Sequence, residues 1–138
     1  MERSKLKHTP EQRALYLEMI DQVSEKWLRV FKGIVENEEE MLQTHYWHLF
    51  TEIWRSKKPI KTKDALTLMK TVKSPQTAMK YLNAAVEAKL LEKNTSEQDS
   101  RVQNIGLSAT MKSRMDVFFD AVIDELRETA LAVDGKRK

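Results

Sequence analysis

The chain has 138 residues, a length that suits one domain with a modest core or one subunit of an oligomer. With 41% hydrophobic and 33% charged residues it is typical of a folded globular protein, and the absence of cysteine excludes disulfides, thiolate catalysis and cysteine-based zinc sites. A formal net charge of +3 permits nucleic-acid binding without requiring it.

No apolar run reaches the roughly 18 residues of a membrane-spanning helix, and the start of the chain, MERSKLKHTPEQR, lacks the apolar core of a secretory signal. We therefore expect a cytoplasmic protein with no membrane partner. Glycine and proline occur only three times each, while Leu, Ala, Met, Glu and Lys are abundant. This composition favours helices over strands.

The first predicted element is a long amphipathic helix. Thr9 can cap it, Pro10 suits the first helical position, and Gln12 stands where a capping-box partner belongs. Apolar residues then recur at spacings of three and four as far as Ile34. Because this apolar surface is wider than one stripe, we expect the helix to pack against more than its own domain.

Two further helices are predicted before residue 74. Asn37 and the three glutamates after it favour a helix start, and the helical period then continues until Lys57-Lys58-Pro59 ends it. A shorter helix is expected from about Lys63 to Lys70.

The segment from Ser74 to Ser108 predicts a helix followed by a hairpin. Ser74-Pro75 caps a helix that runs to about Lys89, and two short apolar strands enclose a polar loop at 94–100. Ser108 caps a last amphipathic helix from about Ala109 to Ala132.

The expected fold is mainly α with a small β-hairpin wing: a winged helix-turn-helix flanked by N- and C-terminal dimerisation helices. Residues 1–138 form one domain, with the DNA-binding unit at 37–108 and the dimerisation helices at 9–35 and 109–133. A two-fold dimer of such units would present paired recognition helices to successive major grooves.

Two stretches resemble the MarR family of winged helix-turn-helix transcriptional regulators. Residues 85–93, AVEAKLLEK, stand where the family has leucine–acid–x–basic–Gly–Leu–Val–Glu–Arg, and Asp99-Ser100-Arg101 followed by Leu107-Ser108 matches its Asp-x-Arg and Leu-Thr. The resemblance implies DNA binding, with Arg101 in the minor groove and Asp99 holding the wing. Lys89 occupies the usual glycine position, so it must adopt a left-handed conformation or alter the turn.

One face of the predicted helix 75–89 carries side chains that can read DNA. Gln pairs with adenine, Lys with guanine or phosphate, and Thr with a base edge or a thymine methyl. The alternatives are a solvated surface, a core-covering role for Tyr81, and a local ion pair for Arg101. The candidate contacts are Lys73, Ser74, Gln76, Thr77, Lys80, Tyr81 and Arg101, with Asp99 as wing support and Lys57, Lys58, Lys61, Lys63 and Lys70 as candidate phosphate contacts.

Other candidate sites are less specific. Five aromatic residues could line an effector pocket or simply form core: Trp27, Tyr46, Trp47, Phe50 and Trp54. His45 and His48 have a spacing compatible with metal ligands, but no third ligand is identifiable, so no metal or cofactor is expected. With no phosphate-binding glycine loop, nucleophile motif or zinc-protease motif, the sequence does not indicate an enzyme.

The sequence thus predicts a homodimeric, sequence-specific transcriptional regulator, a repressor, with helix 75–89 in the major groove and the 94–101 loop in the minor groove. Its expected partners are double-stranded DNA, a second copy of the chain and, as a further candidate, a small-molecule effector. The alternative is a winged-helix protein-interaction adaptor with weak or no sequence-specific DNA binding, which the missing hinge glycine and the weakly charged wing favour.

Overall fold

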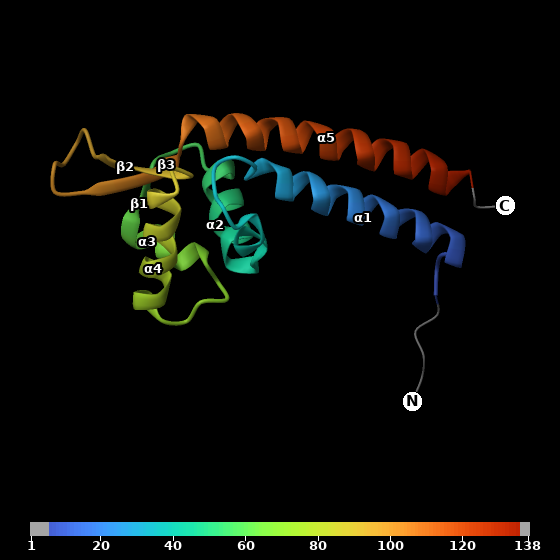
Figure 1. Cartoon of the computed structure of the whole chain (residues 1–138), viewed down its shortest axis with the longest axis horizontal. Coiled ribbons are helices and arrows are strands. Elements are labelled where there is room, and N and C mark those ends of the chain that lie inside the picture. Colours follow the sequence, from blue (N-terminus) through green and yellow to red (C-terminus); the bar gives the residue numbers. More distant parts are fainter. Residues whose placement is uncertain (1–5, 136–138) are drawn as a thin grey trace.

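The computed structural model describes residues 6–135, so the first five and last three residues of the predicted domain lie outside it. The elements follow in the order α1 (Pro10–Val30), the 3₁₀ helix η1 (Glu38–Leu42), α2 (Thr44–Arg55), β1 (Ile60–Lys61), α3 (Thr62–Leu68), α4 (Pro75–Glu87), β2 (Leu91–Thr95), β3 (Gln103–Leu107) and α5 (Ala109–Asp134). The long helices α1 and α5 run antiparallel, side by side, away from a compact unit that holds α2, α3, α4 and the sheet (Figure 1). The mainly helical fold with a small wing is therefore confirmed.

Three helix starts predicted from local sequence are present. Thr9 and Gln12 form a reciprocal capping box, with the Gln12 backbone N–H donating to Thr9 Oγ1 at 3.1 Å and the Thr9 N–H donating to Gln12 Oε1 at 2.9 Å. Ser74 and Ser108 cap α4 and α5 by accepting hydrogen bonds from backbone N–H groups three residues later. Each cap satisfies a helix-end donor that would otherwise lack a partner.

The prediction of a single helix from Asn37 to Lys57 is wrong. The chain forms η1 and α2, separated by Gln43 in an extended conformation with φ −66° and ψ 144°. Met41 before this break and Tyr46 after it are both buried in the core, so the interruption places each side's apolar residues inward. Helix α3 covers 62–68 rather than 63–70, because the backbone of Met69 leaves the helical conformation with φ −82° and ψ 74°.

The wing belongs to a three-stranded antiparallel sheet, not a two-stranded hairpin. The extra strand, β1, has only two residues, and Ile60 pairs with Ile105 of the central strand β3. On the other side of β3, Leu91 pairs with Leu107 and Thr95 with Gln103. Strand β1 therefore fastens the segment before the helix-turn-helix to the base of the wing.

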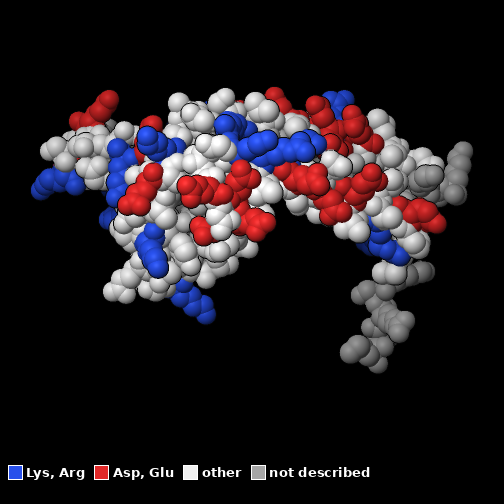
Figure 2. All heavy atoms as spheres, in the orientation of Figure 1, with Lys and Arg blue, Asp and Glu red and all other residues white. Residues whose placement is uncertain are grey.

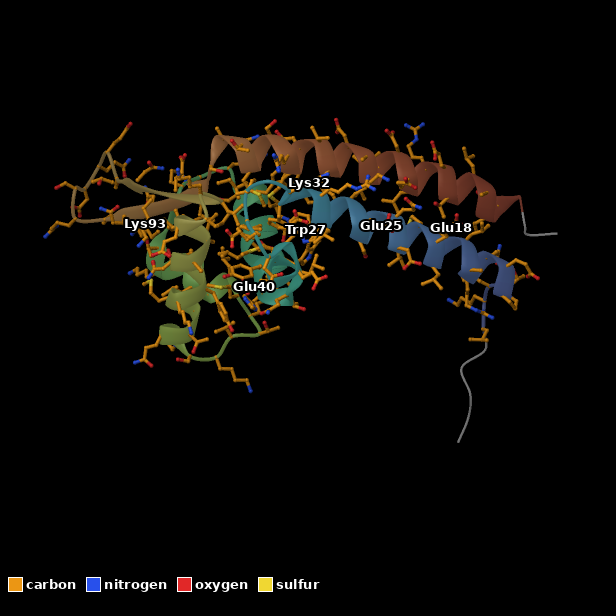
Figure 3. All side chains as sticks on the ribbon, viewed as in Figure 1. Glu18, Glu25, Trp27, Lys32, Glu40 and Lys93 are labelled. Atoms are coloured by element: carbon orange, nitrogen blue, oxygen red, sulfur yellow. The ribbon has the colours of Figure 1, made fainter. Side chains whose placement is uncertain are left out.

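The hydrophobic core fills the compact unit and the adjoining ends of α1 and α5. Trp27 marks this junction (Figure 3), with its ring centroid 4.8 Å from that of Trp47 and 5.0 Å from that of Phe118. Next to Trp27, Lys26 ties α1 to α5 through an ion pair of 2.9 Å with Glu125. None of the helices in residues 6–135 combines the length and hydropathy needed to cross a bilayer.

Candidate nucleic-acid interface

Helix α4 has one buried face and one exposed polar face. Ala78, Leu82 and Ala85 are buried against the rest of the helix-turn-helix. The side chains of Gln76, Thr77 and Lys80, and of Lys73 just before the helix, are exposed. Since the apolar residues fix the rotation of α4, these polar side chains face outward together, as a recognition helix requires.

Two of the candidate contacts also have structural duties. Ser74 is half-buried, and its Oγ accepts from the Thr77 backbone N–H at 3.4 Å. Tyr81 is half-buried with its ring stacked on His45 at a centroid distance of 4.0 Å, and its carbonyl accepts a 3.1 Å hydrogen bond from the Tyr46 hydroxyl. Tyr81 therefore joins the outer face of α4 to α2.

Burial shifts the pKa values of His45 and Tyr46, which pack against Tyr81. It lowers the pKa of His45, whose Nε2 has no hydrogen-bond partner among the described residues. Burial, with the neighbouring Tyr81 and Glu40, raises the pKa of Tyr46 to about 12. Both groups are thus held neutral, which suits an aromatic layer under the recognition helix.

The wing tip is organised around Asp99. Its carboxylate accepts from the backbone N–H of Arg101 at 3.0 Å and from the guanidinium at 3.2 and 3.3 Å. The Arg101 side chain and then its backbone N–H hold the pKa of Asp99 below its ordinary value. Asp99 thereby keeps the exposed arginine at the tip of the loop between β2 and β3.

The turn from α4 into the wing is built around Lys89. This residue has a φ of 63°, in the left-handed region. The Lys89 N–H donates to the Val86 carbonyl and the Leu90 N–H to the Ala85 carbonyl, both at 3.0 Å, which is a Schellman motif with lysine in the glycine position. The usual turn is therefore kept despite the missing glycine, at a conformational cost.

A further contact joins the wing to α4, and the sequence did not reveal it. Lys93 Nζ on β2 donates to Asn83 Oδ1 on α4 at 3.1 Å, and Lys93 projects from the wing strand beside the helix (Figure 3). Because the two residues are ten apart in the chain and follow no motif, only the fold brings them together.

Positive charge concentrates in this part of the molecule. Residues 57–101 contain ten Lys and Arg against five Asp and Glu. Figure 2 shows blue side chains on the wing and around α4 with a few red ones among them, a blue band where α1 and α5 leave the compact unit, and red side chains that dominate the outer part of the α1–α5 pair. An anionic polymer would therefore approach the wing and α4.

Comparisons with known proteins agree with this geometry. No protein-family model and no curated protein matches the sequence. Among solved structures, S. aureus MepR bound to ethidium bromide matches with a TM-score of 0.66 and 17% identity over 92% of this chain and 82% of MepR. A MepR mutant bound to an oligodeoxyribonucleotide gives 0.62 and 17% over 93% and 84%, and a MepR–DNA complex gives 0.58 and 16% over 86% and 90%.

MepR is a MarR-family winged-helix regulator. The chain has a MarR-like fold. At these identities the likeness extends to the fold, and the predicted resemblance to that family is confirmed at this level.

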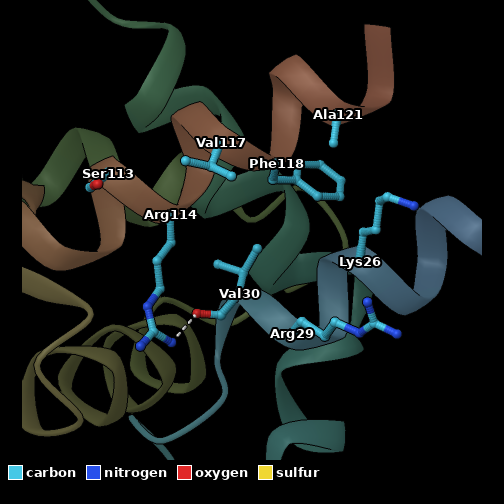
Figure 4. A pocket seen from close by; sticks show the side chains of 8 residues that line it. All are labelled: Lys26, Arg29, Val30, Ser113, Arg114, Val117, Phe118 and Ala121. Atoms are coloured by element: carbon cyan, nitrogen blue, oxygen red, sulfur yellow. Dashed lines mark hydrogen bonds between the residues drawn. The ribbon is translucent and has the colours of Figure 1, made fainter. Parts of the chain in front are cut away.

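Within this MarR-like fold the five aromatic residues of the predicted effector pocket pack on one another or on their neighbours, as Trp27 does on Trp47 and Tyr46 does on Phe50. Trp27, Tyr46 and Phe50 are buried in the core, while Trp47 and Trp54 are each 36% exposed. None of the five lines the cavity at the α1–α5 junction (Figure 4). The effector pocket stays a prediction.

Trp54 has a role that the sequence did not indicate. Its Nε1 donates to Asp116 Oδ1 at 2.8 Å, and its ring lies 4.3 Å from that of Phe119. The hydrogen bond from Trp54, followed by that from Lys112, lowers the pKa of Asp116. This contact fastens α2 of the winged helix to α5.

Among residues 6–135, no three His, Asp or Glu side chains gather as a metal site would require.

Proposed function

We propose that the protein is a sequence-specific DNA-binding transcriptional regulator that acts as a homodimer in the cytoplasm. The observation that carries the proposal is the outward face of α4, with Gln76, Thr77 and Lys80, next to a wing that ends in Arg101. Helix α4 would lie in the major groove and the wing in the minor groove. MepR, which shares this fold, has been solved in complex with DNA.

Exposed apolar residues on the long helices support the homodimer. Tyr16 and Ile20 of α1 and Ile123 and Leu126 of α5 are between 38% and 53% exposed. Apolar side chains that gather on neighbouring helices of a folded chain are typical of an interface. A two-fold dimer through this surface would place two α4 helices on one DNA duplex.

Repression is the mode of action that we propose. Residues 6–135 consist of the proposed DNA-binding unit and a pair of long helices. Such a protein could occupy an operator without the help of another protein. Bound at a promoter, such a dimer would exclude the transcription machinery. A small-molecule effector is a further part of the proposal, because a structure of MepR holds ethidium. Catalysis is not part of it.

The test is a gel-shift titration with the DNA upstream of the protein's own gene. A discrete complex that specific DNA competes away far better than random DNA is the expected result. Because phosphate contacts release counterions, log affinity should also fall linearly with log salt, by about 0.9 per phosphate neutralised. Equal competition by random and specific DNA at every salt concentration would contradict sequence-specific binding.

One observation favours the alternative, a winged-helix protein-interaction adaptor. Asp99 already forms an ion pair with the guanidinium of Arg101. Part of the positive charge at the wing tip is therefore neutralised within the protein, which leaves less of it for a phosphate backbone. If no DNA shifts the protein at low salt while a protein partner binds it stoichiometrically, the adaptor is the better description.

A further inference from the structure

The wing and helix α4 meet at a corner where Lys93 contacts Asn83. Lys93 Nζ of β2 donates to Asn83 Oδ1 of α4 at 3.1 Å, and both side chains are exposed (Figure 3). Because side chains alternate along a strand, Lys93 shares a face of the wing with Leu91, which is buried. Lys93 therefore lies on the wing face that is turned toward α4.

Asn83 belongs to the outward stripe of α4. At about 100° per residue, Gln76, Lys80 and Asn83 fall within about 60° of one another on this helix. Gln76 lies near the start of the stripe, and Asn83 lies at the end that adjoins the wing. The proposed DNA-reading face thus continues into the contact with Lys93.

This corner lies on the path of bound DNA. In the proposed function, α4 lies in the major groove and the wing tip in the adjacent minor groove. One sugar-phosphate strand separates these two grooves, so that strand must pass between α4 and the wing. The contact of Lys93 with Asn83 spans the space that the strand has to cross.

The corner offers hydrogen-bond donors and one positive charge. Lys93 forms no ion pair within residues 6–135, and its ammonium keeps two N–H donors besides the one given to Asn83. Since Asn83 accepts through Oδ1, its Nδ2–H groups are left to donate. Glu87, one turn later on the same stripe, repels anions, so the charge of the corner depends on Lys93. Several donors around a positive charge match the oxygens of a phosphate.

We propose that Lys93 and Asn83 form one phosphate site, which holds the DNA strand that passes between α4 and the wing. Lys93 supplies the charge, and Asn83 adds uncharged donors. The hydrogen bond between them fixes the angle of the wing to α4 around that strand, so Lys93 is a positioning residue as well as a contact. Such a site rests on the proposed function, since it has no role without bound DNA.

The test measures binding of the full chain to the DNA upstream of its own gene and to random DNA over a range of salt concentrations. Lys93→Gln should weaken binding to both DNAs by the same factor, about tenfold, because every sequence carries the phosphate. It should also reduce the slope of log affinity against log salt by about 0.9, the share of one phosphate. Lys93→Arg keeps the charge and should retain the slope.

A double-mutant cycle tests whether the two residues form one site. Asn83→Ala should weaken binding about threefold, the usual loss for an uncharged hydrogen bond. Since the two side chains share one phosphate, Lys93→Gln combined with Asn83→Ala should cost about tenfold rather than about 30-fold. Lys32→Gln removes an exposed lysine beyond the end of α1 and should change neither affinity nor slope. Circular dichroism verifies that each variant is folded.

Three results would overturn the site. An unchanged salt slope in Lys93→Gln removes the phosphate contact, and a loss confined to the upstream DNA makes Lys93 a base reader. Losses that multiply in the double variant show two independent contacts. In each of these cases the wild type still binds DNA, so the proposed function stands; if the wild type binds no DNA, the function and the site are both refuted.

Discussion

The winged-helix unit and the outer part of the α1–α5 pair use their hydrophobic residues in opposite ways. In the first, residues such as Leu49, Phe50 and Leu82 are fully buried. In the second, Leu17 and Ile20 are more than half exposed. The first region has a core of its own, whereas the second presents several large apolar side chains to solvent, which supports the proposed interface.

The two regions also differ in the sign of their net charge. Residues 57–101 carry ten basic and five acidic side chains, while α1 and α5 together carry six basic and ten acidic ones. The basic region suits an anionic polymer, and the acidic helices would be repelled by it. In the proposed function, contact with DNA and dimerisation therefore fall at different ends of the molecule, so each can be disrupted separately.

The largest effect is expected from breaking assembly. Ile20→Asp combined with Leu126→Asp should convert the dimer to a monomer, because carboxylates would be buried in its interface. Binding to the operator should then fall by about 100-fold or more, since the second half-site is no longer held nearby. Sedimentation velocity and gel shifts measure the two effects. Val117→Asp, at an exposed position roughly 180° round α5 from Leu126, is the control and should leave both unchanged. A wild-type protein that is monomeric at micromolar concentration would refute the homodimer.

A smaller and more local effect is expected from removing one contact with DNA. Lys80→Ala and Arg101→Ala should each weaken operator binding about tenfold, the usual loss for one base or groove contact. The dimer and the thermal stability should not change, because both side chains are exposed. Lys32→Ala, beyond the end of α1, is the charge-matched control. Operator affinity equal to wild type in both variants would remove α4 and the wing from the interface.

The features that sequence could predict in these regions are those set by a few neighbouring residues. Thr9, Ser74 and Ser108 cap helices because each bonds to a group three residues away. The order of helices and wing followed from such signals and from apolar spacing, and it fixed which face of α4 is exposed.

The features that sequence could not predict depend on contacts across the fold. The extended conformation at Gln43 follows from burying Met41 and Tyr46 together, and β1 is a strand only because Ile60 meets Ile105. At the candidate site, the stacking of Tyr81 on His45 joins residues of two helices far apart in the chain. No local pattern carries that information.

Lys89 belongs to both kinds of feature. The family resemblance predicts either a left-handed conformation or an altered turn at this position, and only the fold decides for the left-handed one. Lys89→Gly should stabilise the protein by about 1 kcal/mol, because glycine adopts the left-handed conformation without strain although it loses more chain entropy on folding. Urea unfolding measures the change. Lys89→Ala keeps a Cβ and removes the charge, so it should give no comparable gain; equal gains in both variants would trace the effect to charge and not to the backbone.

The smallest predicted effect concerns the aromatic layer beneath α4. Burial lowers the pKa of His45 below its ordinary value of 6.5, so the unfolded chain takes up this proton more readily than the folded one. Stability should therefore be complete above about pH 6.5 and decline as the pH falls below it. His45→Phe retains a ring against Tyr81 and should show a shallower decline between pH 7.5 and 5.5 in urea unfolding. His8→Gln, at an exposed position, should decline as the wild type does, and an unchanged slope in His45→Phe would show that this imidazole is not held neutral by the fold.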